Sequence, residues 1–394
     1  MYNYFQRLLF LLLLFLSLNS FGQHNDIIES KKFVFEPQNE HVHSSTLVEL
    51  PSGDLLCAWF QGSGERTADD ARIMASKYLS RDKEWQEPYI LAETPGVPDC
   101  NPVLFLSQGK LFLVWIAVQA NRWEYSLLKV RITTDFMDTQ IRWDWQDNIL
   151  LKPDESFADE VQKQFSIMPK TNHGWAEYAP KYDHLILSAS KDAMKRSTGW
   201  MTRIKPLIQE DGEILLPLYS DGLNFSLLAR SLDNGKTWKP SRPIVGRGNI
   251  QPVLLRRKNG DLVAYMRDSG DAPSRVQMSV SKDEGYSWSY AVKTDIPSGA
   301  SVEALKWSDE KWIMILNDTE DNKRNKLSLY ASENEGKDWQ LIHHIENDES
   351  EKGRFSYPAL IKTRDGKIHL TFSHHRDNNK KAIRHVVINT DNIK

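Results

Sequence analysis

The octapeptide Ser231-Leu232-Asp233-Asn234-Gly235-Lys236-Thr237-Trp238 occurs again as Ser281-Lys282-Asp283-Glu284-Gly285-Tyr286-Ser287-Trp288 and as Ser332-Glu333-Asn334-Glu335-Gly336-Lys337-Asp338-Trp339. The three copies begin at positions 231, 281 and 332, so one unit recurs about every 50 residues, as in four-stranded propeller blades. The Asp or Asn can bond to its own backbone two residues on and close a turn, and the Gly permits a positive φ. The Trp offers a large apolar surface to bury between blades. We therefore expect an all-β propeller.

A second set of turns predicts the number of blades. Turn residues flanked by β-rich runs occur at 52–56, 108–111, 211–214, 259–262, 308–312 and 365–368. Six turns predict six blades, with seven as the alternative. The step from the second turn to the third is about twice the usual one, so residues 145–200 hold either a degenerate blade or a long inserted loop. We favour the insertion, because 156–165 is typical of a short helix and 170–175 of irregular loop.

The beginning of the chain differs in kind from the rest. Arg7 precedes the apolar run Leu8–Leu18, and small residues follow at 20–22, a pattern typical of a secretory signal peptide over residues 1–22. We expect residues 23–394 to form a single propeller domain that is periplasmic or secreted, with no membrane span after cleavage. We also expect a strand from the other terminus to close the first blade, with 32–36 beside 385–389.

The composition limits the classes of ligand. A net charge of −3 in 394 residues gives no basic surplus of the kind that nucleic-acid binding requires. No Cys/His spacing typical of a metal site is present, and we expect neither a metal nor a cofactor. Cys57 and Cys100 can pair in an oxidising compartment or remain two small buried residues, and the sequence leaves this open.

The repeated octapeptide is known as an Asp box, and the chain resembles the sialidase-like propellers, including those of polysaccharide-degrading bacteria. The resemblance covers nearly all residues after 22. In sialidases three Arg bind the substrate carboxylate, a Tyr activated by a Glu is the nucleophile, and an Asp is the acid/base. By position, Arg267 and Arg324 match two of the Arg and Tyr357 matches the nucleophile. Asp70 or its neighbour Asp69 matches the acid/base Asp.

Two positions depart from the sialidase pattern. His43 stands where the first Arg is expected, and Gln251 stands where the activating Glu is expected. A Gln cannot accept a proton from a phenol whose ordinary pKa is about 10. The resemblance therefore implies the scaffold but not the complete sialidase mechanism.

A His, a Tyr and two Arg can carry out a different reaction on an acidic sugar. Arg267 and Arg324 can bind the carboxylate of a uronic acid, which makes its C5 proton more acidic. One of His43 and Tyr357 can take that proton while the other protonates the oxygen that leaves C4. We therefore expect an exported lyase or dehydratase that acts by β-elimination on uronic-acid-containing glycans, such as those of the ulvan type.

Further residues and functions remain open. Gln251, Arg203 and His173 are candidates for additional contacts to the acidic oligosaccharide. One alternative is a sialidase-like exo-glycoside hydrolase that uses Tyr357 and Asp70. The other is a propeller that binds glycans without catalysis, which the loss of the Glu also permits.

Overall fold

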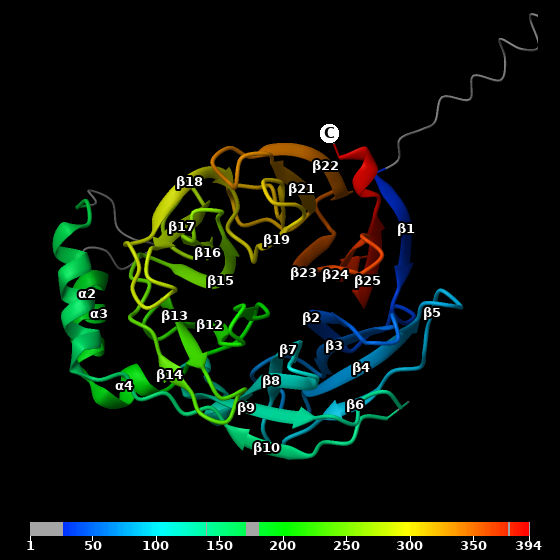
Figure 1. Cartoon of the computed structure of the whole chain (residues 1–394), viewed down its shortest axis with the longest axis horizontal. Helices are drawn as coiled ribbons and strands as arrows, with labels where there is room; N and C mark the ends of the chain where they lie inside the picture. Colours follow the sequence, from blue (N-terminus) through cyan, green and yellow to red (C-terminus); the bar gives the residue numbers. More distant parts are fainter. Residues whose placement is uncertain (1–26, 139, 171–180, 377–378, 394) are drawn as a thin grey trace, which may run out of the picture.

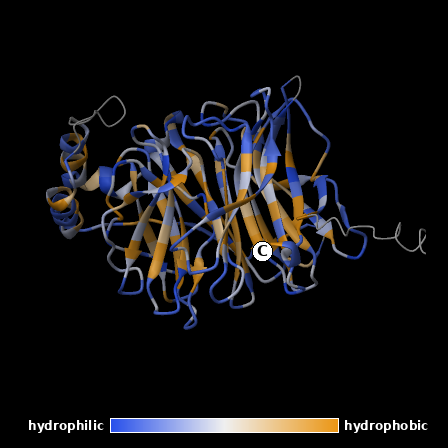
Figure 2. Cartoon of the chain, turned by 90° about the horizontal axis from the view of Figure 1, so that it is seen from above, coloured by the Kyte–Doolittle hydropathy of each residue, from blue (hydrophilic) through white to orange (hydrophobic). Residues whose placement is uncertain are grey.

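The computed structural model describes residues 27–138, 140–170, 181–376 and 379–393. Six antiparallel sheets surround a common centre, and each is a blade of a β-propeller (Figure 1). Apolar residues gather on the strands, whereas the loops at both ends of the strands are mostly hydrophilic (Figure 2). The prediction of an all-β, six-bladed propeller is therefore confirmed.

The first three blades each begin with the strand nearest the centre and continue outward. Blade 1 consists of β2 (His41–Glu49), β3 (Leu55–Gly62), β4 (Arg72–Leu79) and β5 (Glu84–Trp85), and β6 (Tyr89–Ala92) also pairs with β4. Blade 2 consists of β7 (Asp99–Ser107), β8 (Lys110–Val118), β9 (Ser126–Thr133) and β10 (Trp145–Asn148). Blade 3 consists of β11 (Leu207–Ile208), β12 (Ile214–Ser220), β13 (Phe225–Ser231) and β14 (Lys239–Pro240).

The remaining blades follow the same plan. Blade 4 consists of β15 (Asn249–Arg256), β16 (Leu262–Asp268), β17 (Arg275–Ser281) and β18 (Val292–Pro297). Blade 5 consists of β19 (Glu303–Lys306), β20 (Trp312–Leu316), β21 (Lys326–Ser332) and β22 (Gln340–Asn347). Blade 6 consists of β23 (Arg354–Lys362), β24 (Ile368–Arg376), β25 (Lys380–Ile388) and β1 (Ile28–Phe33). Each of the six predicted turns joins the first two strands of one blade.

The N-terminal strand closes the ring. β1 pairs with β25, and Lys32 lies opposite His385, so the two chain ends meet as expected. The prediction was wrong about the blade, because this pairing completes blade 6 and not blade 1. The chain enters the propeller on the outer edge of the last blade and only then begins β2, the inner strand of the first.

The Asp boxes form compact turns between the third and fourth strands of blades 3, 4 and 5. The carboxylate of Asp233 accepts hydrogen bonds from the Ser231 hydroxyl (2.9 Å) and the backbone N–H of Thr237 (2.8 Å). The backbone bond therefore spans four residues, and the predicted span of two was too short for this wider turn. Gly235 has a φ of +84°, and a Cβ there would meet Phe112 Cε1 at 2.5 Å. This Gly serves both the turn and the close packing of neighbouring blades.

The long interval in the sequence is an insertion of helices. After β10 come α2 (Glu155–Ile167), α3 (Lys181–Lys191) and α4 (Ala193–Ser197), which lie on the outer rim in Figure 1. Asp154 caps α2 by accepting from the backbone N–H of Ser156 at 2.9 Å. Phe157 of α2 is buried, with its ring centroid 6.3 Å from that of Trp200 and 6.0 Å from that of Phe225 of blade 3. The described residues contain no seventh blade; the predicted helix is confirmed, and the part of the predicted loop after residue 170 lies outside them.

Short 3-10 helices complete the secondary structure. η1 (Gln119–Asn121) and η2 (Trp123–Tyr125) follow β8, and η3 (Thr390–Asn392) follows β25. Cys57 and Cys100 are buried and free, so the disulfide that the sequence left open is not formed. Among the described residues, no helix is both long and apolar enough to cross a membrane. The predicted signal peptide at 1–22 lies outside the described residues.

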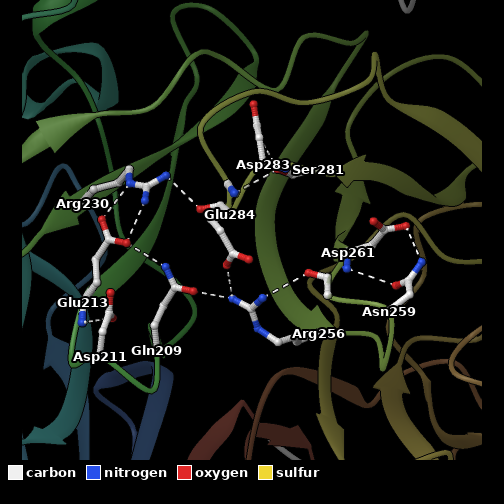
Figure 3. Close-up of polar contacts among 12 residues, drawn as sticks. Gln209, Asp211, Glu213, Arg230, Arg256, Asn259, Asp261, Ser281, Asp283 and Glu284 are labelled. Carbon is white, nitrogen blue, oxygen red and sulfur yellow. Dashed lines mark hydrogen bonds and ion pairs between the residues drawn. The ribbon is translucent and has the colours of Figure 1, made fainter.

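A polar network joins blades 3 and 4 (Figure 3). The buried Arg230 donates to both carboxylate oxygens of Glu213, at 2.9 and 2.7 Å, and to the backbone carbonyl of Glu284 at 2.8 Å. Arg256 in turn donates to the Glu284 carboxylate at 2.6 Å and to the side chain of Gln209. The Asp-box turn of blade 4 is thereby held against the first hairpin of blade 3.

Candidate active site at the centre of the propeller

A cavity of about 420 Å³ lies where the inner strands meet. Four inner strands contribute lining residues: His43 from β2, Asn101 from β7, Gln251 from β15 and Tyr357 from β23. Ile250 of β15 and Trp123 of η2 also line it, and the remaining lining residues come from second strands and loops: Phe60, Glu65, Tyr219, Asp221, Asn224, Arg267, Ser269 and Arg324. The volume is within the range of roughly 300–1,000 Å³ that is usual for small-molecule sites.

The same backbone feature presents the side chains of four inner strands. Each of these strands has a β-bulge at the cavity, with a non-glycine residue at positive φ: Ser44 (56°), Asn101 (50°), Gln251 (58°) and Tyr357 (57°). Such conformations are costly, and bulges redirect side chains, so their repetition around one cavity is typical of a functional site.

A sequence signal for these bulges exists and was missed. Asn101, Gln251 and Tyr357 are each followed by a Pro in a strand-like run. Pro is tolerated within sheets mainly on edge strands and at bulges. The recurring X-Pro pair would therefore have identified Asn101 together with Gln251 and Tyr357.

His43 and Tyr357 are in direct contact. Their ring centroids are 4.0 Å apart, although they come from the first blade and the last. Gln251 Nε2 donates to the Tyr357 hydroxyl oxygen at 3.3 Å, so an amide occupies the position beside the phenol. The Tyr357 hydroxyl accepts this bond and can still donate its own proton.

His43 is held in its neutral form. Burial lowers its pKa well below the ordinary value, and the nearby charges of His375, Arg324, His41 and Arg203 act in the same direction. Its Nδ1 is buried without a hydrogen-bond partner among the described residues, so Nε2 is the ring nitrogen that can open on the cavity. His43 can therefore accept a proton from a bound ligand.

Three predicted Arg residues have different positions. Arg267 and Arg324 both line the cavity, and their anchoring bonds run from Arg267 Nε to the Gly299 carbonyl (3.0 Å) and from Arg324 Nη1 to Ser356 Oγ (3.4 Å). Arg203 is fully buried and does not line the cavity. Its guanidinium lies 4.7 Å from the Tyr357 ring centroid and donates to the Pro358 carbonyl at 2.7 Å. Arg203 therefore supports Tyr357 from behind and is not placed to contact a ligand.

A buried carboxyl group lies near Arg203. Glu303 is buried, and desolvation raises its pKa to about 7, while Lys205 and Arg203 oppose this rise. Lys205 donates to the Leu360 carbonyl. These charges lie outside the residues that line the cavity, so we assign them to the support of the inner strands.

The carboxyl groups in the cavity are not the ones that the sequence suggested. Asp70 is exposed and does not line the cavity, and its carboxylate accepts from the backbone N–H (3.1 Å) and the hydroxyl (2.8 Å) of Ser63. Asp69 accepts from Asn121 Nδ2 at 2.8 Å. Glu65, from the same loop, lines the cavity instead, and Asp221 lines it from the loop after β12. Neither Glu65 nor Asp221 was recognised from the sequence, because no local motif shows which loop side chain lies at the central cavity.

The two carboxyl groups have different proton affinities. Burial works against ionisation of Glu65, but a hydrogen bond and charge from His41 and the charges of Arg324 and Arg66 hold its pKa below the usual value. Desolvation raises the pKa of Asp221 to about 6, although Arg267 opposes the rise. Asp221 can therefore carry a proton at mildly acidic pH. The predicted contact residue His173 lies outside the described residues.

The arrangement has relatives of known structure. A family model described as a BNR repeat-like domain matches residues 53–174 and 186–370. A protein of unknown function from Dyadobacter fermentans superposes with a TM-score of 0.66 at 14% identity, covering 92% of this chain and 98% of that one. The NanB sialidase of Streptococcus pneumoniae gives 0.64 at 12% identity, covering 94% and 71%. The intramolecular trans-sialidase of Ruminococcus gnavus gives 0.61 at 13% identity, covering 90% and 95%.

The likeness to these proteins lies in the fold. No curated protein sequence matches the chain. At 11–14% identity the structural likeness establishes a shared fold, and the chemistry depends on the residues of the cavity.

Proposed function

We propose that this chain, which belongs to the BNR repeat-like family and has the sialidase-type propeller, is an enzyme that eliminates across C4–C5 of a uronic acid in an acidic glycan. The observation that carries the proposal is the contact between a neutral His43 and Tyr357, 4.0 Å apart by ring centroids, in a cavity that Arg267 and Arg324 also line.

The two arginines would bind the substrate carboxylate. A guanidinium pairs with a carboxylate through two parallel hydrogen bonds, and the pairing withdraws negative charge from C6. The proton on C5 then becomes more acidic, because charge that develops next to the carboxyl group is stabilised. The same bound anion offsets the positive charges around His43 and raises the pKa of that imidazole towards its ordinary range. Substrate binding would therefore turn a weak base into a more effective one.

The elimination step balances without a cofactor. Nε2 of His43 takes the C5 proton, the C5–H electron pair forms the C4=C5 double bond, and the C4–O bond breaks. The Tyr357 hydroxyl gives its proton to the departing oxygen, with Gln251 positioning the phenol. Proton transfer from the imidazolium to the phenolate then restores both residues. If a sugar leaves, the enzyme is a lyase; if hydroxide leaves as water, it is a dehydratase.

A sialidase-like exo-hydrolase is the second candidate, and the structural neighbours named as sialidases favour it. Tyr357 would be the nucleophile, and Glu65 or Asp221 would have to replace Asp70 as the acid/base, because Asp70 does not line the cavity. The weakness of this candidate is the contact of Tyr357 with an amide where a base is needed. A glycan-binding propeller without catalysis would need none of these groups to react.

One incubation separates the three candidates. Acidic oligosaccharides are mixed with the protein while ultraviolet absorbance and product masses are recorded. Elimination produces a conjugated double bond that absorbs in the ultraviolet, and dehydration also lowers the mass by one water. Hydrolysis adds one water and gives no absorbance change, and pure binding leaves the ligand intact. If every uronate glycan tested is either hydrolysed or left intact, the proposal is overturned.

A further inference from the structure

A second, larger cavity adjoins the first. Its volume is about 840 Å³, and it shares His43, Glu65 and Arg324 with the cavity that holds Tyr357. A ligand longer than one sugar can therefore extend from one cavity into the other past these shared side chains.

The lining of the second cavity is strongly cationic. It contains the basic side chains Arg324, Lys352, Arg354, Arg376 and Lys381. Among its described lining residues, Glu65 supplies the single carboxylate, and that carboxylate already lies 3.2 Å from His41 Nε2. The charge balance inside the cavity is therefore positive even though the whole chain has a net charge of −3.

Three of these cations lack an acidic partner. Within the part of the chain that the structure describes, neither Lys352 nor Arg354 forms an ion pair, and the Lys381 ammonium donates to the Asn39 carbonyl at 3.4 Å and not to a carboxylate. Lys323, which does not line the cavity, pairs with Glu351 at 2.9 Å. Acidic residues are thus available nearby but do not neutralise these three side chains.

His375 adds a hydrogen-bonding group to the cavity without adding charge at neutral pH. His375 donates from Nε2 to the Val42 carbonyl at 2.7 Å, and its ring centroid lies 5.7 Å from that of His43. Burial is the largest cause that lowers the pKa of His375, to about 4, and the charges of Lys381 and Arg354 contribute. His375 therefore does not contribute to the positive charge of the cavity at neutral pH, whereas the Lys and Arg side chains do.

Positive side chains that line one concave site repel one another when the site is empty, and a bound anion relieves this repulsion. We propose that the second cavity is a subsite for a second oxyanion, a sulfate ester or a carboxylate, carried by the sugar next to the reacting uronic acid. Of the three cations without an acidic partner, Arg354 and Lys381 lie on strands, β23 and β25, and line this cavity and not the first, so they are its principal ligands. This inference rests on the proposed function, and it narrows the substrate class to glycans with anionic groups on neighbouring sugars.

The test uses the double variant Arg354→Ala/Lys381→Ala and isothermal titration calorimetry with four probes. Glucuronic acid carries one anionic group, digalacturonic acid carries a carboxylate on each sugar, a sulfated glucuronyl disaccharide carries a sulfate ester, and inorganic sulfate reports on the subsite alone. The control Lys236→Ala/Lys282→Ala removes the same charge from exposed Asp-box residues outside both cavities.

We expect the subsite variant to lose about tenfold or more in affinity for at least one of the two-anion probes, because each lost charged hydrogen bond is worth about one such factor. Binding of glucuronic acid should stay the same, and the control variant should behave as the unmodified protein. The probe with the larger loss identifies the oxyanion as sulfate ester or carboxylate. Equal affinities of the subsite variant and the unmodified protein for both two-anion probes would overturn the subsite.

Failure of the proposed function gives a different pattern. If no uronate binds to the unmodified protein, elimination on uronates is ruled out, and the sulfate titration decides the subsite. Sulfate binding that is lost in Arg354→Ala/Lys381→Ala and retained in the control supports an oxyanion site. Sulfate binding that is absent, or unchanged in the subsite variant, overturns it.

Discussion

The imidazole of His43 lies against the phenol of Tyr357, with a centroid separation of 4.0 Å, because the first blade and the last stand side by side. Hydrogen bonds across this junction hold the two inner regions together, from the Ser44 backbone N–H to Ser373 Oγ (3.1 Å) and from Ser45 Oγ to Thr371 Oγ1 (3.0 Å). The junction of blade 1 with blade 6 therefore also brings the proposed base and acid together.

The first prediction concerns these two residues. His43→Ala removes the group that accepts the C5 proton, and Tyr357→Phe removes the proton for the leaving group while keeping the ring. Each change should lower turnover by roughly 10²–10⁴-fold, the usual contribution of a general acid or base. The melting temperature should change little in Tyr357→Phe, and circular dichroism checks both variants. Full activity in both would contradict the site assignment.

The second prediction separates elimination from hydrolysis. Gln251→Glu places a carboxylate where an amide now contacts the Tyr357 hydroxyl at 3.3 Å. The carboxylate would accept the phenol's proton and repel the substrate carboxylate, so elimination should fall by about tenfold or more. A hydrolase with Tyr357 as nucleophile would instead gain activity, because its missing base is restored. Initial rates with an unsaturated-product assay and a reducing-sugar assay distinguish the outcomes.

The third prediction tests the carboxylate clamp. In Arg267→Lys the charge remains, but the planar pair of donors is lost, as is the Nε bond to the Gly299 carbonyl. We expect KM for the acidic oligosaccharide to rise about tenfold. Binding of the corresponding uronate methyl ester, which carries no negative charge, is the control and should change much less. Equal losses for both ligands would argue against a carboxylate contact.

Much of the fold could be predicted from the sequence, because turns depend on local residue types. The Asp boxes and the six hairpin turns gave the correct number of blades, since each is closed by nearby Gly, Asp or Ser groups. The choice of blade closed by the N-terminal strand was wrong, because many strands can pair with β25 equally well in terms of local pattern. Ring closure is a property of the whole chain.

The site was predictable where the inner strands determine it. His43, Gln251 and Tyr357 lie at equivalent bulges, so their family positions carried over to one cavity. Loops gave the errors: Asp70 is engaged by Ser63, whereas Glu65 from the same loop lines the cavity. Contacts with other blades determine which carboxylate of a loop faces the cavity. These contacts cannot be predicted from the local residue pattern.

The fourth prediction concerns stability outside the site. Glu213 and Arg230 form a buried ion pair at 2.7 Å, with only 4% and 5% of their side chains exposed. Glu213→Ala leaves the Arg230 charge buried without its partner and should reduce the free energy of unfolding by about 3–5 kcal/mol. The matched control is Glu333→Ala, which breaks the exposed pair with Lys311 and should cost less than about 1 kcal/mol. Urea unfolding measures both, and similar small losses would contradict the assigned role of the pair.

The fifth prediction is an acid sensitivity that comes from a neutral histidine. Burial is the main cause that lowers the pKa of His374 to about 4, with Arg384 and Lys31 contributing. Well above pH 7 the residue is neutral in both the folded and the unfolded chain, so it has no pH-dependent effect. As the pH falls from about 6.5 to 4, the unfolded chain binds a proton at this position and the folded chain does not, so the free energy of unfolding decreases.

His374→Phe isolates this effect from the other titrating groups. The ring contacts Phe33, Phe355 and Phe372 with centroids 5.3, 5.0 and 6.3 Å away, so a Phe fits the chemical character of the site. Near pH 7.5 the variant and the unmodified protein should differ only by a constant. Between pH 6.5 and 4.5 the variant should gain stability relative to the unmodified protein, by up to about 3 kcal/mol. Glu303, whose raised pKa acts in the opposite direction, is present in both proteins and cancels. A stability difference that stays constant over this pH range, measured by urea unfolding, would show that His374 titrates alike in the folded and the unfolded chain.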